Sequence, residues 1–186
     1  MDCTHIPEIS CFYSDTIASH ILNPSAHFEY EMILVTDGSA QVQIHDRTYP
    51  LQRGSLLFIS RLEQHQFCIV KEPYCRYVLS VSSDLLLSHL NEPRLASIFM
   101  QRPEYFSHVV QLNEEQLAYF LPFFQKSADE YEKQPDFYTL QSIAMLLSIL
   151  ISLYRLYPNA FPMEDSSSLS AAVLNAQIYV SRHFNR

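Results

Sequence analysis

Two histidines and two glutamates in the first third of the chain are the residues best suited to metal or ligand chemistry. His27, Glu29 and Glu31 alternate along one segment, and alternate residues of a β-strand point to the same face. His65 follows in a second segment of strand-like composition. Imidazole and carboxylate groups bind zinc, iron, nickel and manganese. His27 and Glu31, which share a face, could therefore contribute to a site for a divalent metal ion.

The same residues also have a metal-free interpretation. Histidines commonly serve as hydrogen-bonded interior residues, and a buried carboxylate needs a partner. Glu31 would then pair with His27 or His65 in a polar network. Both interpretations predict that the three side chains lie within reach of one another.

These residues must be positioned by β-strands. From Ser10 to about Ser82 the chain consists of short β-branched and aromatic runs separated by turn residues, which is typical of a sandwich or barrel. Hairpin turns are predicted at Asp37–Ser39 and at His45–Arg47. In the first of these, Gly38 supplies the positive φ that a tight turn needs. The predicted strands are Cys11–Tyr13, Ile17–Leu22, Phe28–Thr36, Ala40–His45, Thr48–Leu51, Leu56–Ile59, Gln66–Val70 and Arg76–Val81.

After Ser83 the apolar residues recur with the helical period of 3.6. Asn113 and Asp136 are predicted to cap two long helices, and Pro122 is predicted to kink the first of them. The predicted helices are Ser83–Asn91, Arg94–Met100, Asn113–Lys133 and Asp136–Tyr157.

The last of these helices carries more apolar residues than one face can hold. Packing one stripe against the barrel leaves other residues without a partner, and each large side chain left in water forgoes roughly 1.5–3 kcal/mol. We therefore predict a homodimer through the two long helices. The candidate dimerisation residues are Leu140, Ile143, Leu147, Leu150, Ile151 and Tyr154.

Composition and charge exclude several other classes of protein. The chain has 186 residues, 48% of them hydrophobic, and a formal net charge of −8, which disfavours DNA binding by the chain as a whole. The four cysteines lack a C-x-x-C spacing, and the N-terminus lacks the features of a signal peptide. The charge-free run from Phe137 to Tyr154 contains several polar residues and is interpreted as a buried or partner-facing helix. We therefore expect a cytoplasmic protein without a membrane partner.

The spacing of the candidate ligands and of the chain's two glycines resembles the paired motifs of the cupin family, in which a small β-barrel holds a divalent metal. His27 matches the second histidine of the first motif, Glu31 its glutamate and Gly38 its glycine. Gly54 matches the opening glycine of the second motif and His65 its histidine. The residues that depart from the pattern are Ser25 in place of the first histidine, Ser60 in place of a proline, Leu62 in place of a glycine and Ile69 in place of an asparagine. The resemblance implies that the remaining ligands, His27, Glu31 and His65, form a site for one divalent metal ion (zinc, iron, nickel or manganese), with open positions for water or substrate.

The order of the whole chain resembles the AraC family of transcription regulators. Pro158 and a serine-rich stretch form a linker by composition, and the helical segment Leu169–Phe184 then looks like the first helix of that family's DNA-binding domain. The resemblance implies an α+β fold with a cupin-like sensor barrel (residues 1–82), a helical dimerisation region (83–157), a linker (158–168) and the start of a DNA-binding domain (169–186). The helix-turn-helix units of the family would lie beyond this helix, so DNA would be contacted only through them.

In that family the barrel binds a small-molecule effector and is not an enzyme. The resemblance therefore implies an effector site inside the barrel, and its candidate residues are His27, Glu29, Glu31, His65 and Phe67. Two other functions remain open at this stage. One is a metal-dependent cupin enzyme that uses the two histidines and Glu31 in oxygenation, isomerisation or hydrolysis. The other is a binding protein without a regulatory role.

Overall fold

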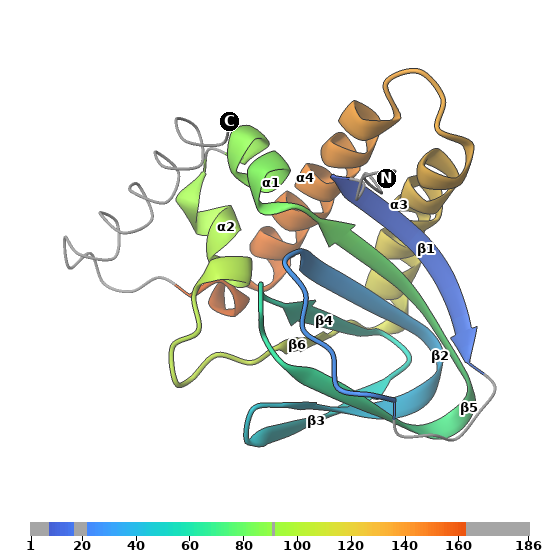
Figure 1. The fold of residues 1–186 in the computed structure, drawn as a ribbon, viewed down its shortest axis with the longest axis vertical. Helices are drawn as coiled ribbons and strands as arrows, with labels where there is room; N and C mark the ends of the chain where they lie inside the picture. The colour runs from blue at the N-terminus through green and yellow to red at the C-terminus, as the bar shows by residue number, and fades with distance from the viewer. Residues whose placement is uncertain (1–7, 17–21, 91, 163–186) are drawn as a thin grey trace, which may run out of the picture.

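The computed structural model describes residues 8–16, 22–90 and 92–162. Within these ranges the strands form one antiparallel sheet of six strands in the order β1-β5-β2-β4-β6, with β3 also paired to β2. The strands are β1 (Ile9–Thr16), β2 (Tyr30–Ile44), β3 (Arg47–Gln52), β4 (Ser55–Ile59), β5 (His65–Val81) and β6 (Val109–Gln111). The helices are α1 (Ser83–His89), α2 (Pro93–Met100), α3 (Glu114–Lys133), α4 (Tyr138–Leu156) and the short 3-10 helix η1 (Pro158–Ala160). The sheet curls into a barrel with the helices gathered at one side of it (Figure 1), which confirms the predicted α+β class.

The two longest strands, β2 and β5, pair along their whole length, from Tyr30 opposite Val81 to Ile44 opposite His65. Each of them is one continuous strand, so the prediction of two strands in its place and of a hairpin turn at Asp37–Ser39 is wrong. The register of β2 shifts at Asp37 and again at Ser39, so the strand bends there without reversing. Some types of bulge and the tight hairpin turns both use a glycine with positive φ, so Gly38 fits either arrangement.

Gly38 permits this bend for a second reason. Its φ is 72°, and a Cβ atom at this position would lie 2.1 Å from the carbonyl oxygen of Pro73 and 2.6 Å from that of Lys71. Only glycine allows the two backbones to approach so closely. The residue thus allows β2 and β5 to stay in close contact where their register shifts.

Other parts of the strand prediction have mixed outcomes. The turn at His45–Arg47 is confirmed, because β2 ends at Ile44 and pairs with β3, which begins at Arg47. Strand β6 was not predicted; it has only three residues and pairs with β4. Of the predicted strand Ile17–Leu22, residues 17–21 lie outside the described residues.

Alternation along β2 divides the apolar residues between two cores. Ile33 and Val35 face the barrel interior, whereas Met32 and Leu34 face the helices. The interior core consists of Ile33, Val35, Ala40, Val42, Ile44, Leu51, Leu57, Ile59, Phe67, Ile69, Tyr74 and Val78.

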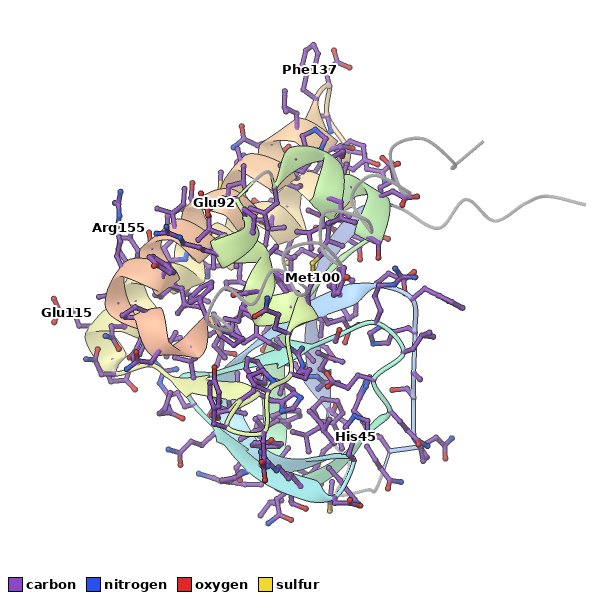
Figure 2. The ribbon with its side chains drawn as sticks, turned by 90° about the vertical axis from the view of Figure 1, so that its left-hand side faces the viewer. His45, Glu92, Met100, Glu115, Phe137 and Arg155 are labelled. Carbon is purple, nitrogen blue, oxygen red and sulfur yellow. The ribbon has the colours of Figure 1, made fainter. Side chains whose placement is uncertain are left out.

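The ends of the two long helices test the predicted caps. Asn113 caps α3 as predicted: its side chain accepts a hydrogen bond from the Gln116 backbone amide, and the Gln116 side chain accepts one from the Asn113 amide. The prediction that Asp136 caps α4 is wrong, because the helix begins after Phe137, which adopts a left-handed conformation with a φ of 66°. Phe137 protrudes at the tip of the α3–α4 connection (Figure 2).

Helix α4 is long and apolar enough to cross a membrane by length and composition alone. One face of it instead packs into the core of the domain, through Ile143, Leu146, Ile149, Leu150 and Leu153. The start of the predicted linker is also ordered, since Pro158–Ala160 form η1 and Phe161 is buried beside Tyr154. The predicted terminal helix Leu169–Phe184 lies outside the described residues.

Candidate ligand-binding site

Two parts of the chain that are distant in the sequence, residues 25–31 and the start of β5, bring the predicted site residues together. Glu31 lies on β2 and pairs with Ser80 of β5 on one side and Ile59 of β4 on the other. His65 begins β5, and an isolated bridge joins it to Ser25, so the segment containing His27 runs alongside it. Glu31 and His65 lie at opposite ends of the β2–β5 pairing, so the curl of the sheet into a barrel brings the three candidate ligands together.

The predicted proximity of His27, Glu31 and His65 is confirmed. One ligand atom from each residue lies within 4.8 Å of the other two. The Nε2 atom of His27 is 3.2 Å from Oε2 of Glu31, and the two imidazole rings are 5.2 Å apart. His65 is buried, while the His27 and Glu31 side chains keep 23% and 16% exposure. The His27 and Glu31 side chains are therefore partly accessible to solvent.

The two histidines are held in the same way. Nδ1 of His27 lies 3.0 Å from the backbone oxygen of Glu29, and Nδ1 of His65 lies 2.9 Å from that of Glu63. Each Nδ1–H therefore donates to a carbonyl, which directs Nε2 toward the site, as is usual for metal-binding histidines. The Nε2 atom of His65 accepts a hydrogen bond of 2.8 Å from the Ser25 hydroxyl.

The charges of the site follow from these contacts. The hydrogen bond with Glu31 raises the pKa of His27, although burial opposes this shift. Burial would raise the pKa of Glu31, but the hydrogen bonds from His27 and Ser80 outweigh it, so this pKa is lowered. Burial lowers the pKa of His65. The site thus favours a protonated His27 beside an ionised Glu31, with His65 neutral.

The two remaining predicted ligand-binding residues lie at the margin of this site. Glu29 precedes β2 and is half-buried, with its carboxylate 3.8 Å from Nδ1 of His27. Phe67 is a buried residue of the interior core, and its ring packs edge-on against His65 at 5.7 Å. Glu29 can therefore add charge beside His27, and Phe67 supplies apolar surface behind His65.

The substitution at Ser25 has a structural counterpart. Ser25 stands where the cupin pattern has its first histidine, and its hydroxyl contacts the neighbouring ligand His65. The position of the missing ligand is thus occupied by a neutral hydrogen-bonding group. Three of the four ligands of the pattern remain.

A second polar cluster, which the sequence analysis missed, lies beside the first. The buried carboxylate of Glu63 accepts hydrogen bonds from Nε of Arg102 at 3.1 Å, Nε2 of His108 at 2.9 Å and the Ser60 amide at 2.8 Å. The Tyr49 hydroxyl lies 2.9 Å from Nδ1 of His108. Burial would raise the pKa of Glu63, but His108, Arg102 and Ser60 together lower it to about 2. This Glu63 cluster borders a cavity of about 310 Å³.

No local signal identifies the Glu63 cluster in the sequence. Its members come from the β4–β5 connection, the segment after α2, the segment before β6 and β3. Glu63 resembles an ordinary polar loop residue until the fold brings Arg102 and His108 to it. Its backbone carbonyl also holds His65, so the cluster joins the candidate site to the segment that follows α2.

The predicted dimerisation residues fall on different faces of α4. Ile143 and Leu150 are buried in the core of the domain, so their side chains are not available to a partner. Leu140 and Ile151 are exposed, and Leu147 and Tyr154 are partly buried. The six predicted dimerisation residues therefore do not form one surface: some lie in the core of the domain and others at its surface.

Comparison with known proteins identifies relatives of this arrangement. The profile of the AraC-like ligand binding domain matches residues 7–150. The chain is similar in structure to the apo form of a ToxT variant from Vibrio cholerae, with a TM-score of 0.56, 10% identity and coverage of 97% of this chain and 67% of that chain. That likeness shows the fold alone.

Partial similarities extend to other barrel proteins. KdgF from Halomonas sp. matches with a TM-score of 0.38 and 14% identity over 41% of this chain and 72% of that chain. A Cupin 2 conserved barrel domain protein from Salinispora arenicola matches with a TM-score of 0.38 and 14% identity over 45% and 71%. A search of curated proteins found no match.

Proposed function

The chain belongs to the family of AraC-like ligand-binding domains, and we propose that it senses a small molecule in the barrel on behalf of a transcription regulator. The observation that carries this proposal is the convergence of His27, Glu31 and His65 at a site that is partly accessible to solvent. These side chains offer hydrogen-bond donors and acceptors beside the apolar ring of Phe67. Such a combination is typical of small-molecule sites.

The site favours an uncharged polar effector. The charges of His27 and Glu31 oppose each other at 3.2 Å, and His65 is neutral at physiological pH. A hydroxyl or carbonyl group of the effector could exchange hydrogen bonds with these residues without leaving a charge unpaired. A strongly charged effector would have to displace one half of the His27–Glu31 pair.

The Glu63 cluster connects the barrel site to the end of helix α2 through hydrogen bonds. His65 donates a hydrogen bond to the Glu63 backbone, and the Glu63 side chain binds Arg102. Arg102 in turn donates hydrogen bonds of 2.9 Å to the backbone oxygens of Ile98 and Gln101 at the end of α2. An effector that moves His65 would therefore disturb the contacts that end α2. We propose this connection as the way in which effector binding changes the helical region.

A divalent metal ion is the second candidate ligand, and the surroundings of Nε2 of His27 favour it. Nε2 of His27 is buried and lies 3.2 Å from a carboxylate oxygen of Glu31. With Nδ1–H donating to a carbonyl, this contact requires either a proton on Nε2 or a cation between the two groups. His27, Glu31 and His65 would hold zinc, iron, nickel or manganese, and a bound ion would supply open positions for an oxygen-bearing effector.

The outer surface of the long helices supports a homodimer. Leu140 and Ile151 of α4 and Tyr119 of α3 are exposed large hydrophobic residues. We propose that two copies of the domain meet there, and that DNA is contacted by a reader domain and not by the acidic chain described above. The regulator would act in the cytoplasm, which agrees with the free thiols of Cys11, Cys68 and Cys75.

The test is a thermal-shift screen of small polar metabolites and divalent metal salts, with isothermal titration calorimetry of each hit. An effector of the barrel site should raise the Tm of the wild-type chain and lose most of this effect with Glu31→Gln and His65→Ala. Glu115→Gln, which removes an exposed carboxylate on α3, is the matched control. Equal shifts in the wild type and both site variants would contradict the proposal. Metal analysis of the purified protein separates the metal-bound from the metal-free form of the site.

A further inference from the structure

We propose that the groove between β1 and α3 is a second binding site, outside the barrel, for an organic cation with a quaternary or multiply alkylated ammonium group. Strand β1 lies at the edge of the sheet and runs beside α3 (Figure 1). The groove has a volume of about 740 Å³, which is within the range of small-molecule sites. Its lining residues are Cys11, Phe12, Tyr13, Tyr77, Gln125, Ala128, Asp129, Tyr131 and Glu132.

Aromatic rings form the floor of this groove. Tyr13 of β1 lies directly opposite Tyr77 of β5, and the two ring centres are 5.2 Å apart at an angle of 57°. Tyr13 is 49% exposed, so its ring is accessible to a ligand. Tyr131 of α3 adds a third phenol ring to the lining. The faces of such rings attract cations through their quadrupole, and weakly hydrated alkylammonium groups benefit most because they lose little hydration.

The charged side chains in the lining are both acidic. Asp129 and Glu132 of α3 border the groove, and no arginine or lysine is among its lining residues. Asp129 lies close enough to act on the rings: the pKa of Tyr77 is raised first by burial, then by the Cys11 thiol and by the charge of Asp129, against a hydrogen bond from Gln125. The groove therefore combines aromatic faces with negative charge, which is complementary to an organic cation and not to an anion.

Asp129 already has a cationic neighbour, but this contact does not block the site. Its carboxylate lies 3.3 Å from Nζ of Lys133, and both side chains are more than half exposed. Ion pairs of this kind contribute little to stability, so Lys133 can move aside for a ligand. The net charge of −8 also favours the approach of a cation.

Metal ions and larger partners are less suitable occupants. Among the described residues, the group that offers three converging metal-ligating side chains is the barrel site, not this groove. Among the described strands β1 is at the edge of the sheet, and its outer side could also pair with a strand of a second copy. Such pairing would use backbone groups of β1 and would not need the carboxylates of α3, so the two occupants can be distinguished by experiment.

The experiment compares choline with its neutral isostere 3,3-dimethylbutan-1-ol by NMR titration of the tyrosine resonances and by calorimetry. Choline should bind in a saturable way, and the isostere should bind at least about fivefold more weakly because only the charge differs. Tyr13→Leu should weaken choline binding about twofold to fivefold, and Asp129→Asn should weaken it by a similar factor. The absence of saturable choline binding, or equal affinity for the isostere, would overturn the proposal.

Two matched controls test the location of the site. Tyr105→Leu and Glu104→Gln remove an exposed ring and a carboxylate outside the groove and should leave choline binding unchanged. Glu31→Gln, which disrupts the barrel site, should also leave it unchanged, so this proposal can fail or succeed independently of the proposed function. An equal loss of binding in the control variants would overturn the assignment to the groove. Choline binding that falls as a dimer forms with protein concentration would instead assign the groove to a second copy.

Discussion

Replacing Arg102 with methionine should show how much the Glu63 cluster contributes to the free energy of unfolding. Methionine keeps an unbranched apolar stem against Phe106, over which the Arg102 guanidinium now packs at 4.3 Å. It removes the hydrogen bond to the Glu63 carboxylate and those to the carbonyls of Ile98 and Gln101. Glu63, only 5% exposed at its side chain, would keep its negative charge but lose its cationic partner.

The structure sets the size of the effect. The pKa of Glu63 is lowered from 4.5 to about 2, and each pKa unit corresponds to 1.36 kcal/mol. The surroundings of Glu63, in which His108, Arg102 and Ser60 outweigh the opposing effect of burial, therefore stabilise the ionised carboxylate by a net amount of about 3 kcal/mol in the folded state. Removing one partner of a buried pair costs about 3–5 kcal/mol, but His108 still donates to Glu63 here. We expect Arg102→Met to lower the free energy of unfolding by about 2–3 kcal/mol.

The assay is urea unfolding followed by circular dichroism at pH 7. The matched control is Arg53→Met, because Arg53 also pairs with a carboxylate, that of Glu114, but at the surface. Exposed ion pairs contribute little, so this variant should unfold nearly as the wild type does. The double variant Glu63→Gln with Arg102→Met should be more stable than Arg102→Met alone, because no buried charge is then left without its partner.

The pH dependence has a definite sign. The folded-state pKa of Glu63 lies below its unfolded value, so its stabilisation is present above pH 4.5 and is lost as the pH falls toward about 2. The difference in stability between wild type and Arg102→Met should therefore be largest above pH 4.5 and shrink below it. A loss in Arg102→Met no greater than that in Arg53→Met, or one independent of pH across this window, would refute the reasoning.

Four further outcomes follow from other parts of the structure. Gly38→Ala should destabilise the chain by more than about 2 kcal/mol in urea unfolding, because its Cβ would lie 2.1 Å from a backbone oxygen and its φ is positive. Asn113→Ala should cost about 1 kcal/mol in the same assay through loss of the capping box. Burial raises the pKa of the Cys11 thiol to about 12, so iodoacetamide at pH 8 should label it only after denaturation, as read by mass spectrometry. Leu140→Asp and Ile151→Asp should shift the protein toward monomer in sedimentation velocity, whereas an unchanged dimer would place the interface elsewhere.

The sequence by itself determined the features that depend on short stretches of chain. The period of two in the segment of Glu31 predicted which side chains share a face, and the structure confirms that Glu31 lies with the inward residues Ile33 and Val35. Asn113 was identified as a cap because its contacts reach only three residues ahead. Periodicity and capping are local, so the identities of neighbouring residues are enough to reveal them.

The sequence also predicted the barrel site, through spacing and through the resemblance to a family. His65 comes from a different segment than His27 and Glu31, and its proximity to them followed from the paired motifs that the three residues match. The Glu63 cluster had no such motif. Its carboxylate, Arg102 and His108 are distant along the chain and meet only because the segments after α2 and before β6 pass beside the β4–β5 connection.

Tertiary structure alone decided the outcome where one local pattern fits two arrangements. Gly38 has a positive φ in a turn and in a bulge alike, and only the pairing of β2 with β5 selected the bulge. The apolar residues of α4 form one broad stripe, and packing against the rest of the domain buried Ile143 and Leu150 while leaving Leu140 and Ile151 exposed. Periodicity reports that a face is apolar but not what covers it, because burial depends on long-range contacts that no short window of sequence contains.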